Sequence, residues 1–370
     1  MGAMRSPAAK VEASNGGQGS PARYRTRRAL AGLALGGLVL PAAAQFVSRP
    51  LAEWSGRLYP SKLAVVVNAD APESVALGEH YRRIRKIPEQ NVVRVHLPGS
   101  PRVLSAAAFA TLKREIDSQL DPSIEAMVLV WTAPYAVECN SITSALTLGF
   151  QADLCRNTCQ PSKPSPYFDS ASSRPYSDHG MRLAMLLPTE PEGLGQAVAD
   201  RGVASDGTWP AGSAYLLKTA DAARSSRAGF FPPSMRLSRP RLSINTLNAD
   251  RIDNKPDVLF YFTGAVRVPG LETLTFLPGA VADHLTSVGG DLLGTAQMSS
   301  LRWLEAGATA TYGTVSEPCN HWQKFPNPTV LLKHYLAGKT VIEAYWKSVA
   351  WPAQGVFLGE PLAAPYGRPR

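Results

Sequence analysis

Downstream of residue 61, short apolar runs alternate with longer segments whose apolar residues recur with a helical period. Residues 62–68 (KLAVVVN) are rich in β-branched side chains, which is typical of a strand. Residues 71–88 show the helical period and carry a proline near each end, so they predict a helix that stops before Pro88. Residues 91–98 predict a second strand. This order indicates a β-α-β unit with parallel strands and a covering helix.

The same alternation extends through most of the chain. Further strands are predicted at residues 125–132, 181–188, 213–219, 257–264, 307–315 and 356–361. Further helices are predicted near residues 104–120, and at 193–202, 221–231, 278–290, 327–338 and 340–350. This regularity predicts an α/β fold in which a doubly wound, mainly parallel sheet is sandwiched by helices. Functional sites in such folds lie beyond the C-terminal ends of the strands.

Residues 133–180 interrupt this rhythm. They are rich in proline and serine and contain three of the four cysteines. Long irregular segments inside compact domains are usually functional or disordered. We therefore expect a single α/β domain over residues 62–366, with residues 133–180 forming a surface excursion over the strand ends.

The N-terminus has the pattern of a secretory signal. A basic stretch, RYRTRR, precedes 12 uncharged residues (29–40), and the small-residue sequence PAAAQ follows them. This order predicts a signal peptide over residues 1–44, removed before Gln45, and a linker over residues 45–61. The TRRALA sequence also fits the loose twin-arginine pattern, which leaves the secretion route open. The predicted location is therefore outside the cytoplasm, in the periplasm or the extracellular medium.

The predicted leader changes the meaning of the net charge. The whole chain carries +9, but the leader holds six basic residues and one acidic residue, which leaves 32 and 28 in the remainder. A nucleic-acid partner is not expected from so small an excess. No later stretch is long and apolar enough to span a bilayer, so no stable transmembrane anchor is expected after cleavage.

Several blocks resemble an uncharacterised family of exported bacterial proteins that tends to occur in species carrying the exosortase protein-sorting system. The blocks are VVVNADAPESVALGEHYRRIRKIP, YAVECNSITSALTLGF, FLPGAVADHLTSVGG, GATATYGTVSEPCN and GKTVIEAYWKSVAWPAQGVFLGEPLAAPY. The resemblance extends from about Lys62 to Tyr366. It implies an association with cell-envelope, exopolysaccharide or protein-sorting systems. It implies no reaction and no cofactor, and it leaves the partner unknown.

The C-terminal part is also similar to gingipain-like and caspase-like cysteine peptidases, through a small-residue strand, the EAYW helix and the turn Gly359-Glu360-Pro361. That similarity implies a histidine at the end of one strand and a nucleophilic cysteine at the end of the next. Here the strand ending in Thr263-Gly264 has no such histidine. The next strand-like piece, TLTFLPGA, has no cysteine, so the usual dyad is missing.

The sequence VSEPCNHW, residues 315–322, nevertheless offers a candidate nucleophile in Cys319. A reactive thiolate needs a nearby base or positive charge, and His284 is the favoured partner, with His321 as the other candidate. One hypothesis is therefore a divergent cysteine hydrolase that uses Cys319 and His284. The other is an exported protein without catalysis, and the redox state of Cys319 distinguishes the two.

A disulfide is the competing role for the same cysteine. Four cysteines in an exported chain favour two bonds, and three pairings are possible. Cys155 and Cys159 are four residues apart, which suggests that they pair locally. Cys139 and Cys319 lie in similar turns, VECN and EPCN, so we expect them to form the second bond if both turns emerge at one edge of a parallel sheet.

Other kinds of site have weaker support. Glu317, Cys319 and His321 could bind a metal, with Cys155, Cys159 and His179 as further ligands, but the spacings are not those of a zinc site. Phosphate-binding glycine motifs and the GxSxG serine motif are absent from the sequence. Asp70 and Asp221, at strand ends, are more simply explained as helix caps.

Overall fold

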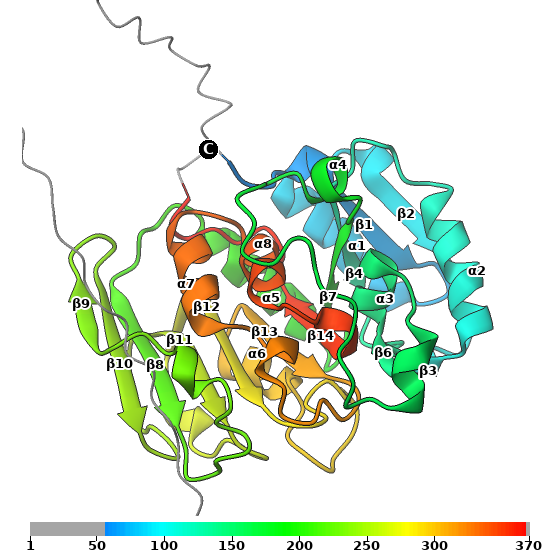
Figure 1. Ribbon diagram of the computed structural model, residues 1–370. Helices are drawn as coiled ribbons and strands as arrows, with labels where there is room; N and C mark the ends of the chain where they lie inside the picture. The colour runs from blue at the N-terminus through cyan, green and yellow to red at the C-terminus, as the bar shows by residue number, and fades with distance from the viewer. Residues whose placement is uncertain (1–55, 368–370) are drawn as a thin grey trace, which may run out of the picture. The chain divides into compact units, whose positions relative to one another are not determined.

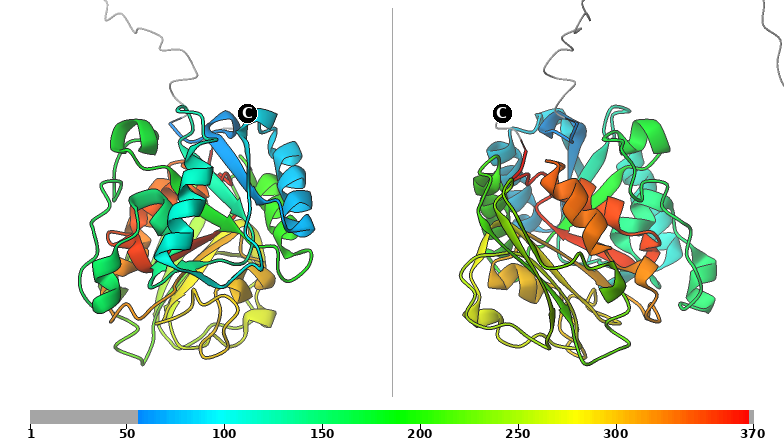
Figure 2. Two further views of the ribbon diagram at one scale, coloured as in Figure 1. Left: turned by 90° about the vertical axis from the view of Figure 1, so that its right-hand side faces the viewer. Right: turned by 60° about the vertical axis from the view of Figure 1, so that its left-hand side comes forward.

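The computed structural model describes residues 56–367, so the predicted leader and most of the predicted linker lie outside the described residues. Its centre is an 11-stranded sheet with the order β2-β1-β4-β7-β14-β13-β12-β11-β8-β10-β9, flanked by helices on both faces (Figures 1 and 2). A second sheet, β3-β5-β6, is small. This architecture confirms the predicted α/β fold with a mainly parallel, doubly wound sheet.

The elements have the following bounds. The main sheet contains β1 (Leu63–Asn68), β2 (Val92–Val95), β4 (Ala126–Val130), β7 (Leu183–Leu187), β8 (Gly212–Lys218), β9 (Met235–Leu237), β10 (Leu242–Asn248), β11 (Val258–Gly264), β12 (Phe276–Leu285), β13 (Ala310–Thr314) and β14 (Gly355–Gly359). The small sheet contains β3 (Val103–Leu104), β5 (Ala136–Val137) and β6 (Asn140–Ser141). The helices are α1 (Pro72–Arg85), α2 (Ala106–Asp117), α3 (Ile142–Leu148), α4 (Pro175–His179), α5 (Leu194–Ser205), α6 (Leu301–Ala306), α7 (Pro328–Leu336) and α8 (Val341–Ser348).

The main sheet consists of two parallel blocks that run in opposite directions. One block is β2-β1-β4-β7-β14 and the other is β13-β12-β11-β8-β10. They meet where β13 and β14 pair antiparallel, with Thr314 opposite Gly355. Numbered along the chain, the strands of each block follow the order 2-1-3-4-5, which is a doubly wound order. The strands of one block therefore end where the strands of the other block begin, so their C-terminal ends point to opposite sides along the strand direction.

Packing of neighbouring residues on β11 shows that α6 and α7 cover opposite faces. Tyr261 packs edge-on against Trp303 of α6, and Phe260 packs edge-on against Tyr335 of α7. Successive strand residues point to opposite faces, so the two helices lie on the two sides of the sheet. All seven residues of β11 are buried, as expected for a strand covered on both faces.

Two predicted helices are absent. Residues 278–290 contain all but the first two residues of β12 instead, and residues 221–231 form turns with a short 3-10 helix, Ala228–Phe230. Every residue from 279 to 285 is buried. When all positions are buried, apolar periodicity cannot distinguish a strand from a helix, which explains the first error.

The excursion over residues 133–180 is partly core. Helix α3 begins after Ser141, whose side chain accepts a hydrogen bond from the backbone of Ser144, and its residues from 142 to 147 are all buried. The expectation that residues 140–180 form only a surface element is therefore wrong for α3. The following stretch alternates exposed and buried residues and has little regular structure.

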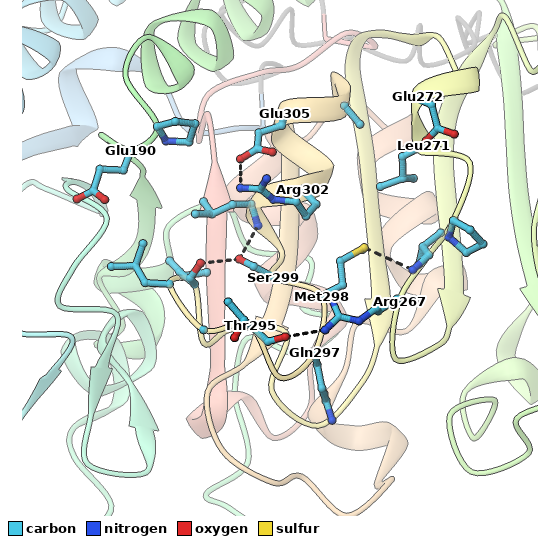
Figure 3. A pocket seen from close by; sticks show the side chains of 18 of the residues that line it. Glu190, Arg267, Leu271, Glu272, Thr295, Gln297, Met298, Ser299, Arg302 and Glu305 are labelled. Carbon is cyan, nitrogen blue, oxygen red and sulfur yellow. Dashed lines mark hydrogen bonds and ion pairs between the residues drawn. The ribbon is translucent and has the colours of Figure 1, made fainter.

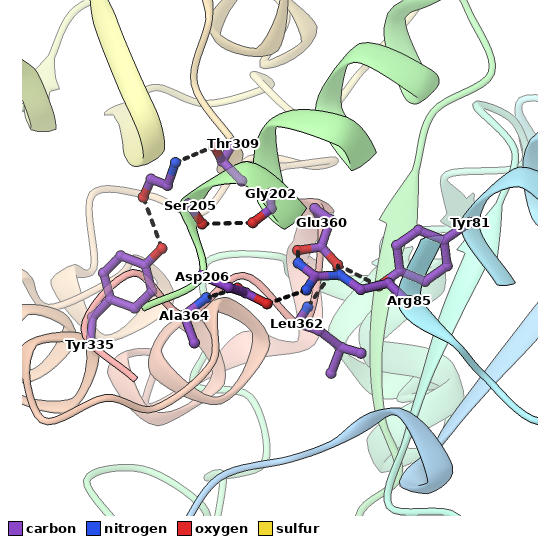
Figure 4. A network of polar contacts seen from close by, with 11 residues as sticks. Tyr81, Arg85, Gly202, Ser205, Asp206, Thr309, Tyr335, Glu360, Leu362 and Ala364 are labelled. Atoms are coloured by element: carbon purple, nitrogen blue, oxygen red, sulfur yellow. Dashed lines mark hydrogen bonds and ion pairs between the residues drawn. The ribbon is translucent and has the colours of Figure 1, made fainter. Parts of the chain in front are cut away.

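A buried polar network joins the two ends of the domain (Figure 4). Glu360, which follows β14, is fully buried and accepts hydrogen bonds from Tyr81 and Arg85 of α1. Arg85 also forms an ion pair with Asp206, just after α5. Burial and the Glu360 carboxylate together raise the pKa of Tyr81 well above its usual value. The network therefore fixes the closing Gly-Glu-Pro turn to α1.

Candidate functional site

All four cysteines are bonded, in two disulfides that differ from the predicted pairs. Cys139 pairs with Cys155, and Cys159 pairs with Cys319, with Cα atoms 5.3 and 5.1 Å apart. No free cysteine remains among the described residues, which include all four. Both bonds involve the excursion over residues 133–180, but the predicted pairs Cys155–Cys159 and Cys139–Cys319 are wrong.

The position of residues 152–159 explains the observed pairing. The Ser316 hydroxyl donates a hydrogen bond of 2.7 Å to the carbonyl oxygen of Cys139, so the VECN and EPCN turns are neighbours, as predicted. The strands that precede the two turns, β4 and β13, point in opposite directions. The turns meet because the chain reverses its direction between the end of β4 and Cys139. The segment over residues 152–159 carries the other two cysteines. Its Cys155 forms a disulfide with Cys139 in the first turn, and its Cys159 forms a disulfide with Cys319 in the second.

The turn that carries Cys319 is tightly held. The backbone N–H of Cys319 donates a hydrogen bond of 2.8 Å to the Glu317 carboxylate. Cys319 and Asn320 both have a positive φ, 58° and 59° respectively. Lys324 is fully buried, and its ammonium group donates to the carbonyl oxygen of Thr158, next to Cys159. Burial lowers the pKa of Lys324 to about 8. These contacts give the turn a structural role in this oxidised state.

His284 lies at the end of β12 with both ring nitrogens engaged. Trp303 donates its indole N–H to Nδ1 over 2.9 Å, and Nε2 lies 3.1 Å from the carbonyl oxygen of Met298. Nδ1 must therefore be the acceptor and Nε2 the donor, which is the neutral tautomer. Burial lowers the pKa of His284 to about 3.

The structure does not assemble the predicted dyad. The Cys319 sulfur is bonded to Cys159, and neither nitrogen of His284 is free to accept a proton from a thiol. The strand ends that the peptidase similarity singles out carry no dyad either. Ala265 follows β11, while β12 is followed by Thr286, whose hydroxyl is hydrogen-bonded to Gln297 and Arg224.

A large pocket lies on the α6 side of β11 and β12 (Figure 3). Its volume is about 1150 Å³. One wall is the crossover between β11 and β12, residues 267–274, and the other is formed by residues 292–299 and α6. Glu190 and Pro191, after β7, contribute from a third segment. The pocket thus combines parts of both parallel blocks.

His284 positions both parts of the second wall. Its Nε2–H donates a hydrogen bond to the Met298 carbonyl oxygen, and its Nδ1 accepts one from the indole N–H of Trp303, which lies on α6. The backbone N–H of Met298 also donates 3.0 Å to the carbonyl oxygen of Val266, which joins the two walls. His284 was predicted as a site residue; it does not itself line the pocket, and it is hydrogen-bonded to Met298 of the lining and to Trp303 of α6.

Charged side chains occur at several points of the lining. Arg302 forms an ion pair with Glu305, and burial raises the pKa of that carboxyl group above its usual value. Arg267 donates 2.6 Å to the carbonyl oxygen of Thr295. This pocket was not predicted from the sequence. The only signal for it was a pair of leucines in an irregular segment, GDLLGTAQM.

The remaining sequence candidates have ordinary structural roles. The carboxylate of Asp70 pairs with His96, and that of Asp221 accepts a hydrogen bond from the backbone of Arg224. Within residues 56–367, no group of three His, Cys, Asp or Glu side chains is placed to hold a metal ion. The predicted metal alternative at Cys319 is wrong in this state because its sulfur is bonded.

Comparisons with known protein families, curated proteins and solved structures found no match to the chain. The resemblance to an exported, exosortase-associated family and the similarity to cysteine peptidases therefore stay predictions. No helix in the described part of the chain is long and apolar enough to cross a membrane.

Proposed function

We propose that the chain is an exported protein of the cell envelope that acts by binding a ligand and not by thiol catalysis. The observation that carries this proposal is the state of the two predicted catalytic residues. The Cys319 sulfur forms a disulfide with Cys159, and His284 is a buried neutral imidazole with both nitrogens in hydrogen bonds. The described residues form instead an open pocket of about 1150 Å³ beside α6.

Two disulfides support the exported location, because such bonds persist mainly in oxidising compartments. The signal-peptide pattern over residues 1–44 supports it independently. A link to exopolysaccharide or protein-sorting systems rests on the family resemblance alone, and it forms part of the proposal on that basis.

The alternative function, a cysteine hydrolase, requires two changes in the molecule. The Cys159–Cys319 bond must be reduced, and His284 must leave Trp303 and Met298 to accept a proton. Removing the second set of contacts would leave a buried indole N–H and a carbonyl group without partners, which is costly. We therefore prefer the binding function.

The test is to express the full chain in a bacterial host and purify it from the exported fraction. N-terminal sequencing should find a start near Gln45. A thiol-directed epoxide probe should not label the protein without reductant, and casein hydrolysis should stay at background. The double variants C159S/C319S and C139S/C155S each remove one disulfide without leaving a free thiol, and both should match the wild type in the two assays. Probe labelling or hydrolysis by the wild type that only C159S/C319S abolishes would refute the proposal.

A further inference from the structure

We propose that the pocket beside α6 binds an extended peptide segment with aliphatic side chains and basic groups. This inference rests on the proposal that the protein acts by binding, and it adds the site and the class of ligand. The pocket volume, about 1150 Å³, exceeds the roughly 300–1,000 Å³ of ordinary small-molecule sites. A ligand longer than a typical metabolite is needed to fill it.

The lining selects for aliphatic groups. Leucines and a methionine form most of its apolar part: Leu271, Leu274, Leu292, Leu293, Leu301 and Met298. The lining residues, all of them in the described part of the chain, include no aromatic side chain. A sugar chain usually stacks on aromatic rings, so this surface suits it poorly. Aliphatic peptide side chains match the leucine surface, and methionine adapts to their shape.

Two carboxylates at the rim select for positive charge. Glu190 and Glu272 are exposed, and neither side chain forms a hydrogen bond or ion pair with any residue between 56 and 367. In Figure 3 they lie at opposite sides of the pocket. The other charges are engaged, because Arg302 pairs with Glu305 and Arg267 donates to backbone carbonyl groups. The two rim carboxylates can therefore pair with basic groups at separate points of a ligand. With Glu305 they outnumber the two arginines of the lining, Arg267 and Arg302, so the formal charges favour a cationic ligand over an anionic one.

The crossover wall also offers a backbone donor. The N–H of Val268 has the Met298 sulfur as its hydrogen-bond partner, at 3.4 Å. A thioether is a weak acceptor, and a peptide carbonyl group is a strong one. Rotation of the flexible Met298 side chain would let a peptide carbonyl accept this bond. An acyl chain has no group to make the exchange, which again favours a peptide.

The test uses fluorescence polarisation with the full exported protein and a labelled hexapeptide, Lys-Leu-Ala-Leu-Ala-Lys. Two further labelled peptides separate the contributions: one with glutamates replacing both lysines and one with serines replacing both leucines. Glu190→Gln and Glu272→Gln remove the rim charges without touching the core. Glu192→Gln is the matched control, because Glu192 is also exposed and does not line the pocket.

We expect the lysine-leucine peptide to bind best. Each rim variant should weaken its binding by about threefold or more, as for a partly exposed ion pair, and Glu192→Gln should leave binding unchanged. Equal binding of the lysine and glutamate peptides, equal effects of the rim and control variants, or no binding of any of the peptides would each overturn the inference. None of these outcomes creates a reactive thiol, so the absence of thiol catalysis is decided separately.

Discussion

Trp303 donates its indole N–H to Nδ1 of His284 over 2.9 Å, in a part of the core where both residues are buried. This bond fixes the imidazole as an acceptor on one side and a donor to the Met298 carbonyl group on the other. It also links the end of β12 to α6, and so to one wall of the pocket. A histidine that the sequence suggested as a base is therefore hydrogen-bonded to residues that form or support one wall of the pocket.

Replacing His284 with phenylalanine should destabilise the protein. The ring size is similar, but the Trp303 N–H and the Met298 carbonyl oxygen lose their partner. Each unpaired buried group costs about 1–3 kcal/mol, so we expect the free energy of unfolding to fall by about 3 kcal/mol. Urea denaturation followed by tryptophan fluorescence measures this. His96→Ala, at an exposed site, is the control. An equal effect of the two substitutions would contradict the role of these hydrogen bonds.

His284 should also make stability depend on pH. Its pKa is about 3 in the folded protein because of burial, and about 6.5 when unfolded. The unfolded state therefore binds the proton first, and the contribution of His284 to stability is present above pH 6.5 and is lost as the pH falls towards 3. Denaturation at several pH values should show a shallower slope over this range in His284→Phe. His96 has a raised pKa because of Asp70, so His96→Ala should alter the slope in the opposite direction. A slope unchanged by His284→Phe would contradict the assignment.

The two disulfides should contribute unequally to stability. Cys139 and Cys155 are separated by 16 residues, and Cys159 and Cys319 by 160. The loss of chain entropy in the unfolded state grows with this separation, giving about 3 and about 5 kcal/mol, respectively. The double variant C159S/C319S should therefore unfold at lower denaturant concentration than C139S/C155S. The reverse order would show that native contacts outweigh the entropic term.

The Glu360 network should behave as a buried ion pair. Glu360→Gln keeps the side-chain volume but leaves the buried Arg85 guanidinium with Asp206 as its remaining anionic partner. Breaking such a pair costs about 3–5 kcal/mol, and we expect the lower value because Asp206 remains. Thermal and urea denaturation measure the loss. Glu79→Gln, which removes an exposed pair on the same helix α1, should have no measurable effect. A Glu360→Gln protein as stable as Glu79→Gln would contradict the account.

The sequence predicted the architecture well where strands and helices differ in length and period. The runs at residues 62–68 and 257–264 are short and rich in β-branched or aromatic residues, and they form β1 and β11. It failed at β12, where almost every position is buried and periodicity carries no information. It also missed α3 and β10. Helix α3 has only seven residues, too few to show a clear period among serines and threonines.

The site was less predictable than the fold because it depends on strand direction. The disulfide prediction assumed that the turns at Cys139 and Cys319 leave one edge of a parallel sheet. The antiparallel junction of β13 and β14 shows that their parent strands point in opposite directions. No local pattern reveals this junction. The pocket depends on it as well, since Glu190 follows a strand of one block and Met298 follows a strand of the other.

Mapping the cysteines of the exported protein tests the central claim most directly. The protein is alkylated with iodoacetamide without reductant, digested, and analysed by mass spectrometry before and after reduction. We predict that no cysteine is alkylated without reductant, and that peptides linked through Cys139–Cys155 and Cys159–Cys319 are found. A Cys319 thiol that is alkylated in the folded, unreduced protein would contradict the account and restore the cysteine hydrolase as the leading function.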